Sequence, residues 1–170
     1  FVVIGGQNGY IYASYDGGRT WDTVENGQAT ANNITEIDIC PTNHQVIYAA
    51  TSAADVIIKT TNGGRSWHAA TPTGMAGTGV FSLCVINENT VLVGTDEGEV
   101  WQTTDGGDSW TEQGDLPVTT KGTADIVDIV LCGCGVLYLL VSDTDESEYL
   151  IFRNVDGGAD GKWFLPDDIE

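Results

Sequence analysis

The chain has 170 residues, of which 25 are acidic and only 6 are basic, so its formal charge is −19. Apolar residues make up 41% of the chain, enough for a packed core, and its 22 glycines indicate many turns. Because binding to nucleic acid or to an anionic membrane needs clustered Lys and Arg, and the six bases are scattered, we expect neither kind of partner.

Short apolar runs bounded by Gly, Asn and Asp follow one another along the whole chain, a pattern typical of β-strands. The first group has three runs, at 1–5, 10–14 and 20–24. The second has four, at 34–40, 46–51, 56–61 and 66–70. The third has four, at 80–86, 90–94, 99–104 and 109–113. The fourth has four, at 126–131, 136–141, 149–154 and 162–165. No stretch has a convincing helical period, so we expect an all-β chain.

The longest apolar stretch, 126–141, contains Asp128 and is interrupted by alternating Cys and Gly at 132–135. A membrane-spanning helix needs about 20 apolar residues without such breaks. We therefore interpret this stretch as two buried strands around a glycine turn.

One pattern, eight residues long in three copies and ten in the fourth, occurs four times: after the second run of the first group and after the third run of each later group. A hydroxyl residue is followed by Asp or Asn, two glycines and a Trp, and the tryptophans recur at intervals of 46, 43 and 53 residues. The positions in chain order are Ser14, Asp16, Gly18 and Trp21; Thr60, Asn62, Gly64 and Trp67; Thr103, Asp105, Gly107 and Trp110; and Asp156, Gly158 and Trp163. A repeat of this length with strands between turns is typical of propeller blades.

The chemistry of this pattern favours a tight turn. An Asp or Asn side chain can accept N–H groups of its own turn, and the glycines can adopt the positive φ angles of a hairpin. The preceding hydroxyl can add a local hydrogen bond. The Trp that follows is expected to cover the sheet and bury a large area. We therefore assign these residues a structural role.

The four copies resemble the Asp-box, or BNR, repeat, in which Ser or Thr is followed by Asp, Gly, Thr or Ser, and Trp at fixed spacing. Asn62 replaces Asp in the second copy, and the fourth copy has Asn154 in the hydroxyl position and two extra residues before Trp163. The resemblance implies a β-propeller of four-stranded antiparallel blades with the box at the outer rim. The expected blades cover about 1–26, 33–72, 79–116 and 124–168.

The strand count indicates an incomplete ring. The first blade has three strands and the other three have four, which gives fifteen, one short of four full blades. Propellers of the resembling families usually have six or more blades. We therefore expect an open arc that is part of a larger ring or is completed by another chain.

No motif nominates a catalytic site. A sialidase gathers three arginines, whereas Arg19 and Arg65 lie within boxes and Arg153 stands beside the fourth. A xyloglucanase-type hydrolase needs two carboxylates that face each other across a cleft, about 5–9.5 Å apart, and no spacing identifies such a pair. His44 and His68 have no nucleophile motif beside them.

Three further features have two interpretations each. The segment 143–148 could supply oxygen ligands to Ca²⁺, but it lacks the glycine and the distal Glu of an EF-hand loop, and we favour a solvated acidic hairpin. Cys40, Cys84, Cys132 and Cys134 are interpreted as buried or free thiols rather than as a disulfide or a metal site, and the first three are expected near the ends of channel-lining strands. Exposed tyrosines could stack on a sugar or a partner, although strand tyrosines more often pack between blades.

The sequence thus predicts a non-catalytic structural or interaction module, a rigid propeller scaffold within a larger extracellular or virion assembly such as a phage structural protein. We expect no cofactor and no metal, and protein partners that include other copies or the missing part of the ring. Two alternatives stay open. One is a fragment of a glycoside hydrolase or a glycan-binding propeller, and the other is a protein-binding propeller similar to photosystem assembly factors.

Overall fold

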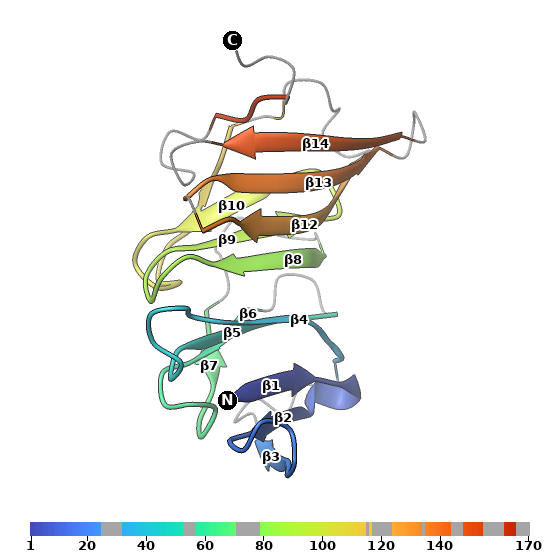
Figure 1. The fold of residues 1–170 in the computed structure, drawn as a ribbon. Helices are drawn as coiled ribbons and strands as arrows, with labels where there is room; N and C mark the ends of the chain where they lie inside the picture. The colour runs from blue at the N-terminus through green and yellow to red at the C-terminus, as the bar shows by residue number, and fades with distance from the viewer. Residues whose placement is uncertain are drawn as a thin grey trace.

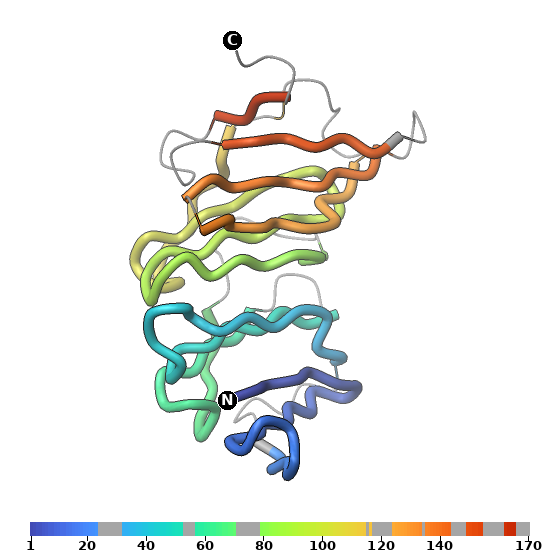
Figure 2. Tube along the Cα trace, viewed as in Figure 1, coloured from blue at the N-terminus to red at the C-terminus, as the bar shows by residue number. Residues whose placement is uncertain are grey.

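Four antiparallel sheets follow one another in an arc in the computed structural model (Figure 1). The structure describes residues 1–24, 32–52, 57–70, 79–114, 116, 124–133, 135–143, 148–154 and 162–165. Each sheet contains one of the expected blades, and consecutive strands are neighbours within it. The first and last blades lie at opposite ends of the arc (Figure 2). The described residues therefore form an open arc.

The described residues contain fourteen strands. Blade 1 consists of β1 (Val2–Gly5), β2 (Ile11–Ser14) and β3 (Asp22–Val24), with a single 3-10 turn, η1 (Gln7–Gly9), between the first two. Blade 2 consists of β4 (Ile34–Ile39), β5 (Ile47–Thr51), β6 (Ile57–Thr60) and β7 (His68–Ala69). Blade 3 consists of β8 (Val80–Val85), β9 (Val91–Thr95), β10 (Val100–Thr103) and β11 (Thr111–Glu112). Blade 4 consists of β12 (Ala124–Leu131), β13 (Leu137–Asp143) and β14 (Glu148–Asn154).

The fifteenth strand, expected at 162–165, is reduced to one bridge. The N–H groups of Arg153 and Phe164 each donate to the carbonyl oxygen of the other residue, at 2.8 and 2.9 Å. A single bridge of this kind is too short to count as a strand. The described part of blade 4 therefore has three strands where we predicted four.

The first strands of blades 2, 3 and 4 share one irregularity. Each has an extra residue opposite its second strand, at Thr35, Phe81 and Val127. The bulge lies at the same place in the repeat each time. A β-bulge bends its strand and increases the local twist, so these three residues are turned out of the ladder. Phe81 and Val127 are consequently exposed.

The core lies between blades rather than within any one of them. Three buried apolar clusters fill the junctions between successive blades. The largest fully buried side chains are Tyr48 in blade 2 and Phe152 in blade 4. Successive blades therefore bury their facing surfaces against one another, as the units of a repeat protein do.

The four box tryptophans differ in burial. Trp67, Trp110 and Trp163 are 5%, 8% and 3% exposed, whereas Trp21 is 40% exposed. The expectation that every box Trp covers its sheet is therefore wrong for Trp21. Trp21 lies in the first blade, at one end of the arc, whereas the three buried tryptophans belong to the later blades.

Candidate functional site

The side chains of the Asp-box turns bond mostly to their own turn. In the first box, Oδ1 of Asp16 accepts the N–H groups of Arg19 and Thr20, both at 2.9 Å, and the Ser14 hydroxyl at 2.9 Å. The Ser14 oxygen in turn accepts the Gly18 N–H at 2.8 Å. These bonds to the charged form hold the pKa of Asp16 down, to about 2.

The second and third boxes have the same geometry. Asn62 accepts the Ser66 N–H at 3.0 Å, and Asp105 accepts the Ser109 N–H at 2.9 Å. The Ser109 hydroxyl also donates to Asp105, whose pKa is lowered to about 2, mainly by this bond. The glycines Gly63, Gly64, Gly106 and Gly107 all have positive φ, as a tight turn requires. In the fourth box Asp156 and Gly158 lie outside the described residues.

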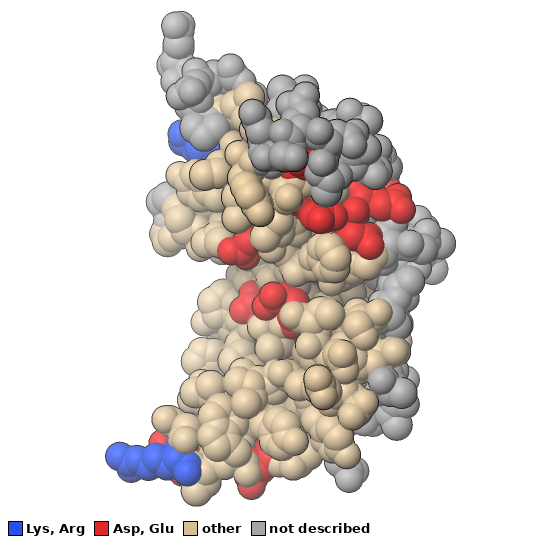
Figure 3. Space-filling model, turned by 90° about the vertical axis from the view of Figure 1, so that its right-hand side faces the viewer, with Lys and Arg blue, Asp and Glu red and all other residues tan. Residues whose placement is uncertain are grey.

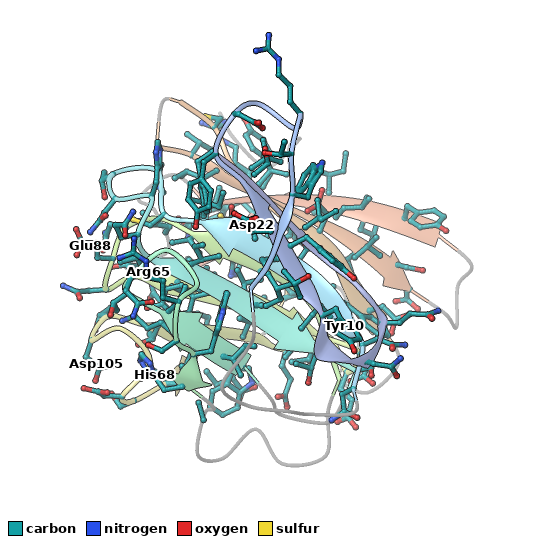
Figure 4. The ribbon with its side chains drawn as sticks, turned by 90° about the horizontal axis from the view of Figure 1, so that it is seen from below. Tyr10, Asp22, Arg65, His68, Glu88 and Asp105 are labelled. Atoms are coloured by element: carbon teal, nitrogen blue, oxygen red, sulfur yellow. The ribbon has the colours of Figure 1, made fainter. Side chains whose placement is uncertain are left out.

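Figure 4 shows that Arg65, His68 and Asp105 lie on one side of the arc and Tyr10 on the other. Arg19, Arg65, His44 and His68 are all exposed. Among the described residues no group of three or more His, Cys, Asp or Glu could hold a metal ion. No helix in the described part of the chain is long and apolar enough to span a membrane.

The cysteines behave differently from one another. Cys40 and Cys84 are buried free thiols, whereas Cys132 forms a disulfide, so the prediction of a free thiol is wrong for Cys132. Cys134 lies outside the described residues. Burial, together with the nearby charge of Asp38, raises the pKa of Cys84 to about 11 and disfavours its reactive thiolate.

The segment 143–148 joins β13 to β14, with residues 144–147 outside the described residues. Asp143 at the end of β13 is buried, at 6% exposed. The calcium interpretation of this segment therefore stays a prediction.

An acidic hollow at the middle of the arc is the strongest candidate for a binding surface. It has a volume of about 400 Å³, opens widely to solvent and lies between β4, β8 and β12. We call it the central hollow, and the residues that matter most in it are Glu36, Asp38, Cys84 and Val130. Figure 3 shows acidic side chains gathered over the middle of the molecule.

Asp38 braces two blades across the central hollow. One carboxylate oxygen accepts the N–H of Ile39 at 2.8 Å, and the other accepts the N–H of Val85 in the next blade at 2.8 Å. Burial raises the pKa of Asp38, although these two bonds oppose the rise. Its carboxylate is therefore already engaged by backbone groups and ties β4 to β8.

Glu36 is the less constrained acid of the central hollow. Among the described residues, its carboxylate accepts the N–H of Ile37 alone, at 3.2 Å. Burial raises its pKa, and the charges of Asp128 and Asp38 raise it further. Three carboxylates from two blades thus produce a negative potential at the middle of the arc.

The acids of the central hollow were not predicted from the sequence, although their positions within apolar strands could have indicated them. Glu36, Asp38 and Asp128 interrupt apolar first strands, where an acid is costly unless it meets a partner or solvent. The bulges that set their direction could not be located without the structure.

Comparison with known proteins supports the fold. The model of the Sortilin-Vps10 family, described as "Sortilin, neurotensin receptor 3", matches residues 9–112. No curated protein sequence matches the chain.

Several solved structures are similar to this chain in fold. An ancestral GH74 enzyme is 18% identical at a TM-score of 0.66, with 95% of this chain and 22% of that chain covered. The GH74 xyloglucanase from Xanthomonas campestris is 13% identical at a TM-score of 0.68, with 96% and 27% covered. YCF48 from Cyanidioschyzon merolae is 14% identical at a TM-score of 0.61, with 78% and 39% covered. A structure of YCF48 bound to D1 peptide is 14% identical at a TM-score of 0.58, with 98% and 78% covered.

These likenesses confirm the predicted all-β, Asp-box propeller fold. The chain spans less than a third of the length of either GH74 enzyme. At such identities the structures inform on fold alone.

Proposed function

Since the chain belongs to the Sortilin-Vps10 family, we propose that it is a non-catalytic interaction module, a rigid propeller arc within a larger extracellular or virion assembly. The central hollow supports this proposal most directly. It is wide, shallow and acidic, and its central carboxylate, Asp38, is occupied by two backbone N–H groups. An acid held in this way stiffens the surface and is poorly suited to proton transfer.

The partner that suits this surface is a protein segment with basic side chains. Glu36 and Asp128 add negative charge beside the apolar side chains of Val130 and Ile39. A segment that alternates basic and apolar residues would match both features. The likeness to a propeller solved with a bound peptide adds support for this class of partner.

The proposed extracellular or virion location is supported by two features. Cys132 forms a disulfide, and disulfides persist mainly in oxidising environments. The chain is also acidic and rich in Gly, with few bases, which favours solubility.

A peptide-binding experiment tests the proposed function. Isothermal titration would compare a short synthetic peptide of alternating Lys and Val with the same peptide carrying Glu for Lys. We expect the basic peptide alone to bind, with an affinity that falls as salt rises. The double variant Glu36→Lys and Asp128→Lys should abolish binding, whereas the matched double variant Asp108→Lys and Glu112→Lys, made at exposed positions of blade 3, should retain it. Equal binding of both peptides, or no effect of the central variant, would contradict the proposal.

One observation favours a second candidate, action on a glycan. Glu36 has a raised pKa beside the charge of Asp128, as in pairs of carboxylates that divide acid and base roles. GH74 enzymes are also among the similar folds. Release of reducing sugar from xyloglucan by the wild-type chain, and its loss in Glu36→Gln, would support this candidate. Failure of the wild-type chain to release sugar from xyloglucan or a β-glucan would exclude it.

A further inference from the structure

The sequence contains one acceptor motif for N-linked glycosylation, and this motif lies at the start of blade 2. The motif is Asn, any residue except Pro, and then Ser or Thr, and Asn33, Ile34 and Thr35 match it. No other asparagine of the sequence is followed two positions later by Ser or Thr. Three residues match often by chance, so the structural setting of the motif has to support a glycan.

Asn33 is exposed, and its side chain is oriented by one hydrogen bond. Its Oδ1 accepts the N–H of Asn8 in η1 at 3.1 Å. Its Nδ2, the atom to which a glycan is attached, has no hydrogen-bond partner among the described residues. The backbone of Asn33 is fixed by Ser52, because the Asn33 N–H donates to the Ser52 hydroxyl at 3.0 Å and the Asn33 carbonyl accepts the Ser52 N–H at 2.8 Å. The acceptor nitrogen is therefore held at the surface.

Thr35 is exposed as well, because the bulge of β4 turns it out of the ladder. Its hydroxyl donates to the carbonyl oxygen of Val80 in the next blade at 3.4 Å, which is a long and weak hydrogen bond. Between the two, Ile34 is partly buried and packs against the apolar cluster that contains Ile47. The two residues that define the motif thus lie at the surface on either side of an anchored residue.

The fold does not require an Asn and a Thr at these positions. Blades 3 and 4 have the same bulge with other residues: Gly79 and Asp125 stand in the position of Asn33, and Phe81 and Val127 in that of Thr35. The equivalence follows from the ladders, since the carbonyl of Gly79 accepts the N–H of Asp96 as that of Asn33 accepts the N–H of Ser52. The backbone geometry therefore leaves the motif unexplained.

We propose that Asn33 carries an N-linked glycan when the chain passes through a secretory pathway. This inference rests on the extracellular location in the proposed function, and the disulfide of Cys132 suits the same oxidising compartment. The donor is a lipid-linked oligosaccharide diphosphate. Nδ2 of Asn33 forms a bond to the anomeric carbon of the first sugar, the bond from that carbon to the diphosphate oxygen breaks, Nδ2 loses one proton, and the lipid diphosphate leaves.

The folded chain accommodates the product of this transfer. The linkage replaces one of the two N–H groups of Nδ2 and leaves Oδ1 unchanged, so the hydrogen bond from Asn8 is retained. Thr35 lines an open hollow together with Phe81 and Val127, which are 46% and 41% exposed. A glycan that starts two residues from Thr35 covers apolar side chains that otherwise face water, and it adds a bulky, solubilising group.

Production of the chain in cultured animal cells tests this inference. A cleavable secretion leader placed before the 170-residue chain makes its entry into the secretory pathway independent of its natural location. We expect intact masses spread above 18.1 kDa, in the cell extract and in the medium. Treatment with peptide-N-glycosidase should return them to about 18.1 kDa without denaturant, because Asn33 is exposed. The chain made without the leader should stay at that mass.

Two matched pairs of variants identify the acceptor. Asn33→Asp keeps an oxygen for the Asn8 N–H but lacks Nδ2, so it should abolish the mass increase. Asn89→Gln, at an exposed asparagine outside the motif, is its control and should keep the increase. Thr35→Val removes the hydroxyl and should lower the glycosylated fraction by about tenfold or more, whereas Thr35→Ser preserves the motif and should keep the glycan.

Two results would overturn the inference. One is a wild-type chain that has entered the pathway, as removal of its leader shows, and still has a mass of 18.1 kDa. The other is a mass increase that persists in Asn33→Asp, because the sugar would then be attached elsewhere. Since no peptide is present and the leader sets the location, these outcomes are distinct from failure of the proposed peptide binding.

Discussion

The indole N–H of Trp110 donates to the carbonyl oxygen of Ala70 at 3.1 Å, and this bond ties the third Asp-box to the residue that follows β7, the last strand of the blade before it. The indole bonds of two other box tryptophans are local. Trp67 donates to Gly64 in its own box at 3.1 Å, and Trp21 donates to Gly18 in its own box at 3.2 Å. The same motif therefore stabilises a turn in two copies and a junction between blades in the third.

Replacement of Trp110 by Phe should destabilise the chain more than the same change at Trp21. Trp110→Phe leaves the buried carbonyl of Ala70 without its donor, which costs about 1–3 kcal/mol. Trp21 is 40% exposed, so Trp21→Phe should cost less than about 1 kcal/mol. Urea unfolding followed by fluorescence of the remaining tryptophans measures both. Equal losses would show that the bond to Ala70 contributes nothing specific.

A methyl group at Gly94 should disrupt the junction of blades 3 and 4. An added Cβ would overlap Cγ2 of Ile126 and the Ser82 hydroxyl, and overpacking of this kind costs about 1–3 kcal/mol. Gly6→Ala is the control, because its nearest neighbour would be Tyr10 O at 3.6 Å and its φ of −136° suits any residue. Thermal unfolding of both variants measures the difference. A Gly94→Ala variant as stable as Gly6→Ala would contradict the close packing.

The fold follows from the sequence because its signals are local. The box residues specify their turn through bonds of a few residues' reach, such as Asp16 to Thr20, and the strand pattern repeats with them. What could not be predicted depends on contacts between blades. Nothing near Asp38 in sequence indicates that it bonds to Val85, 47 residues away. The bulge at Phe81 and the exposure of Trp21 are likewise set by tertiary packing, which a periodic pattern does not encode.

The positions of the cysteines illustrate the same limit. Cys40 and Cys132 each follow directly after a first strand, whereas Cys84 lies within β8 at the position of Asp38. Cys84 therefore faces the central hollow, as expected for a channel-lining residue, but it is not the counterpart of the other two. A shift of two residues could not be noticed without the register of the ladders.

Cys84 should react slowly with thiol reagents despite its place in the central hollow. Its pKa is raised to about 11 by burial and by the charge of Asp38, so very little thiolate exists near neutral pH. Iodoacetamide labelling at pH 8, followed by peptide mapping, should show slower modification of Cys84 than of an unfolded control in urea. Asp38→Asn should speed labelling modestly, because one charge is removed. Fast labelling of the folded wild type would contradict this assignment.

Acid should lower the stability of the folded chain because it protonates the aspartates of the Asp-boxes. The pKa of Asp16 and that of Asp105 are both lowered to about 2 in the folded chain, from 3.8. The unfolded chain therefore takes up protons first as the pH falls, so the stabilisation is complete above about pH 4 and is lost progressively toward pH 2. Burial raises the pKa of Glu36, Asp38 and Asp125, and these groups act in the opposite sense.

The contribution of the box aspartates to acid unfolding can be tested by replacing them with Asn, the residue found in the second box. Asn62 keeps the same turn without a titrating group, accepting the Ser66 N–H at 3.0 Å. In Asp16→Asn with Asp105→Asn, the urea midpoint should therefore fall less between pH 5 and pH 2 than in the wild type. Asp108→Asn, at an exposed acid of the third box, is the control and should follow the wild-type curve. Parallel curves for the double variant and the wild type would mean that these two carboxylates do not govern acid unfolding.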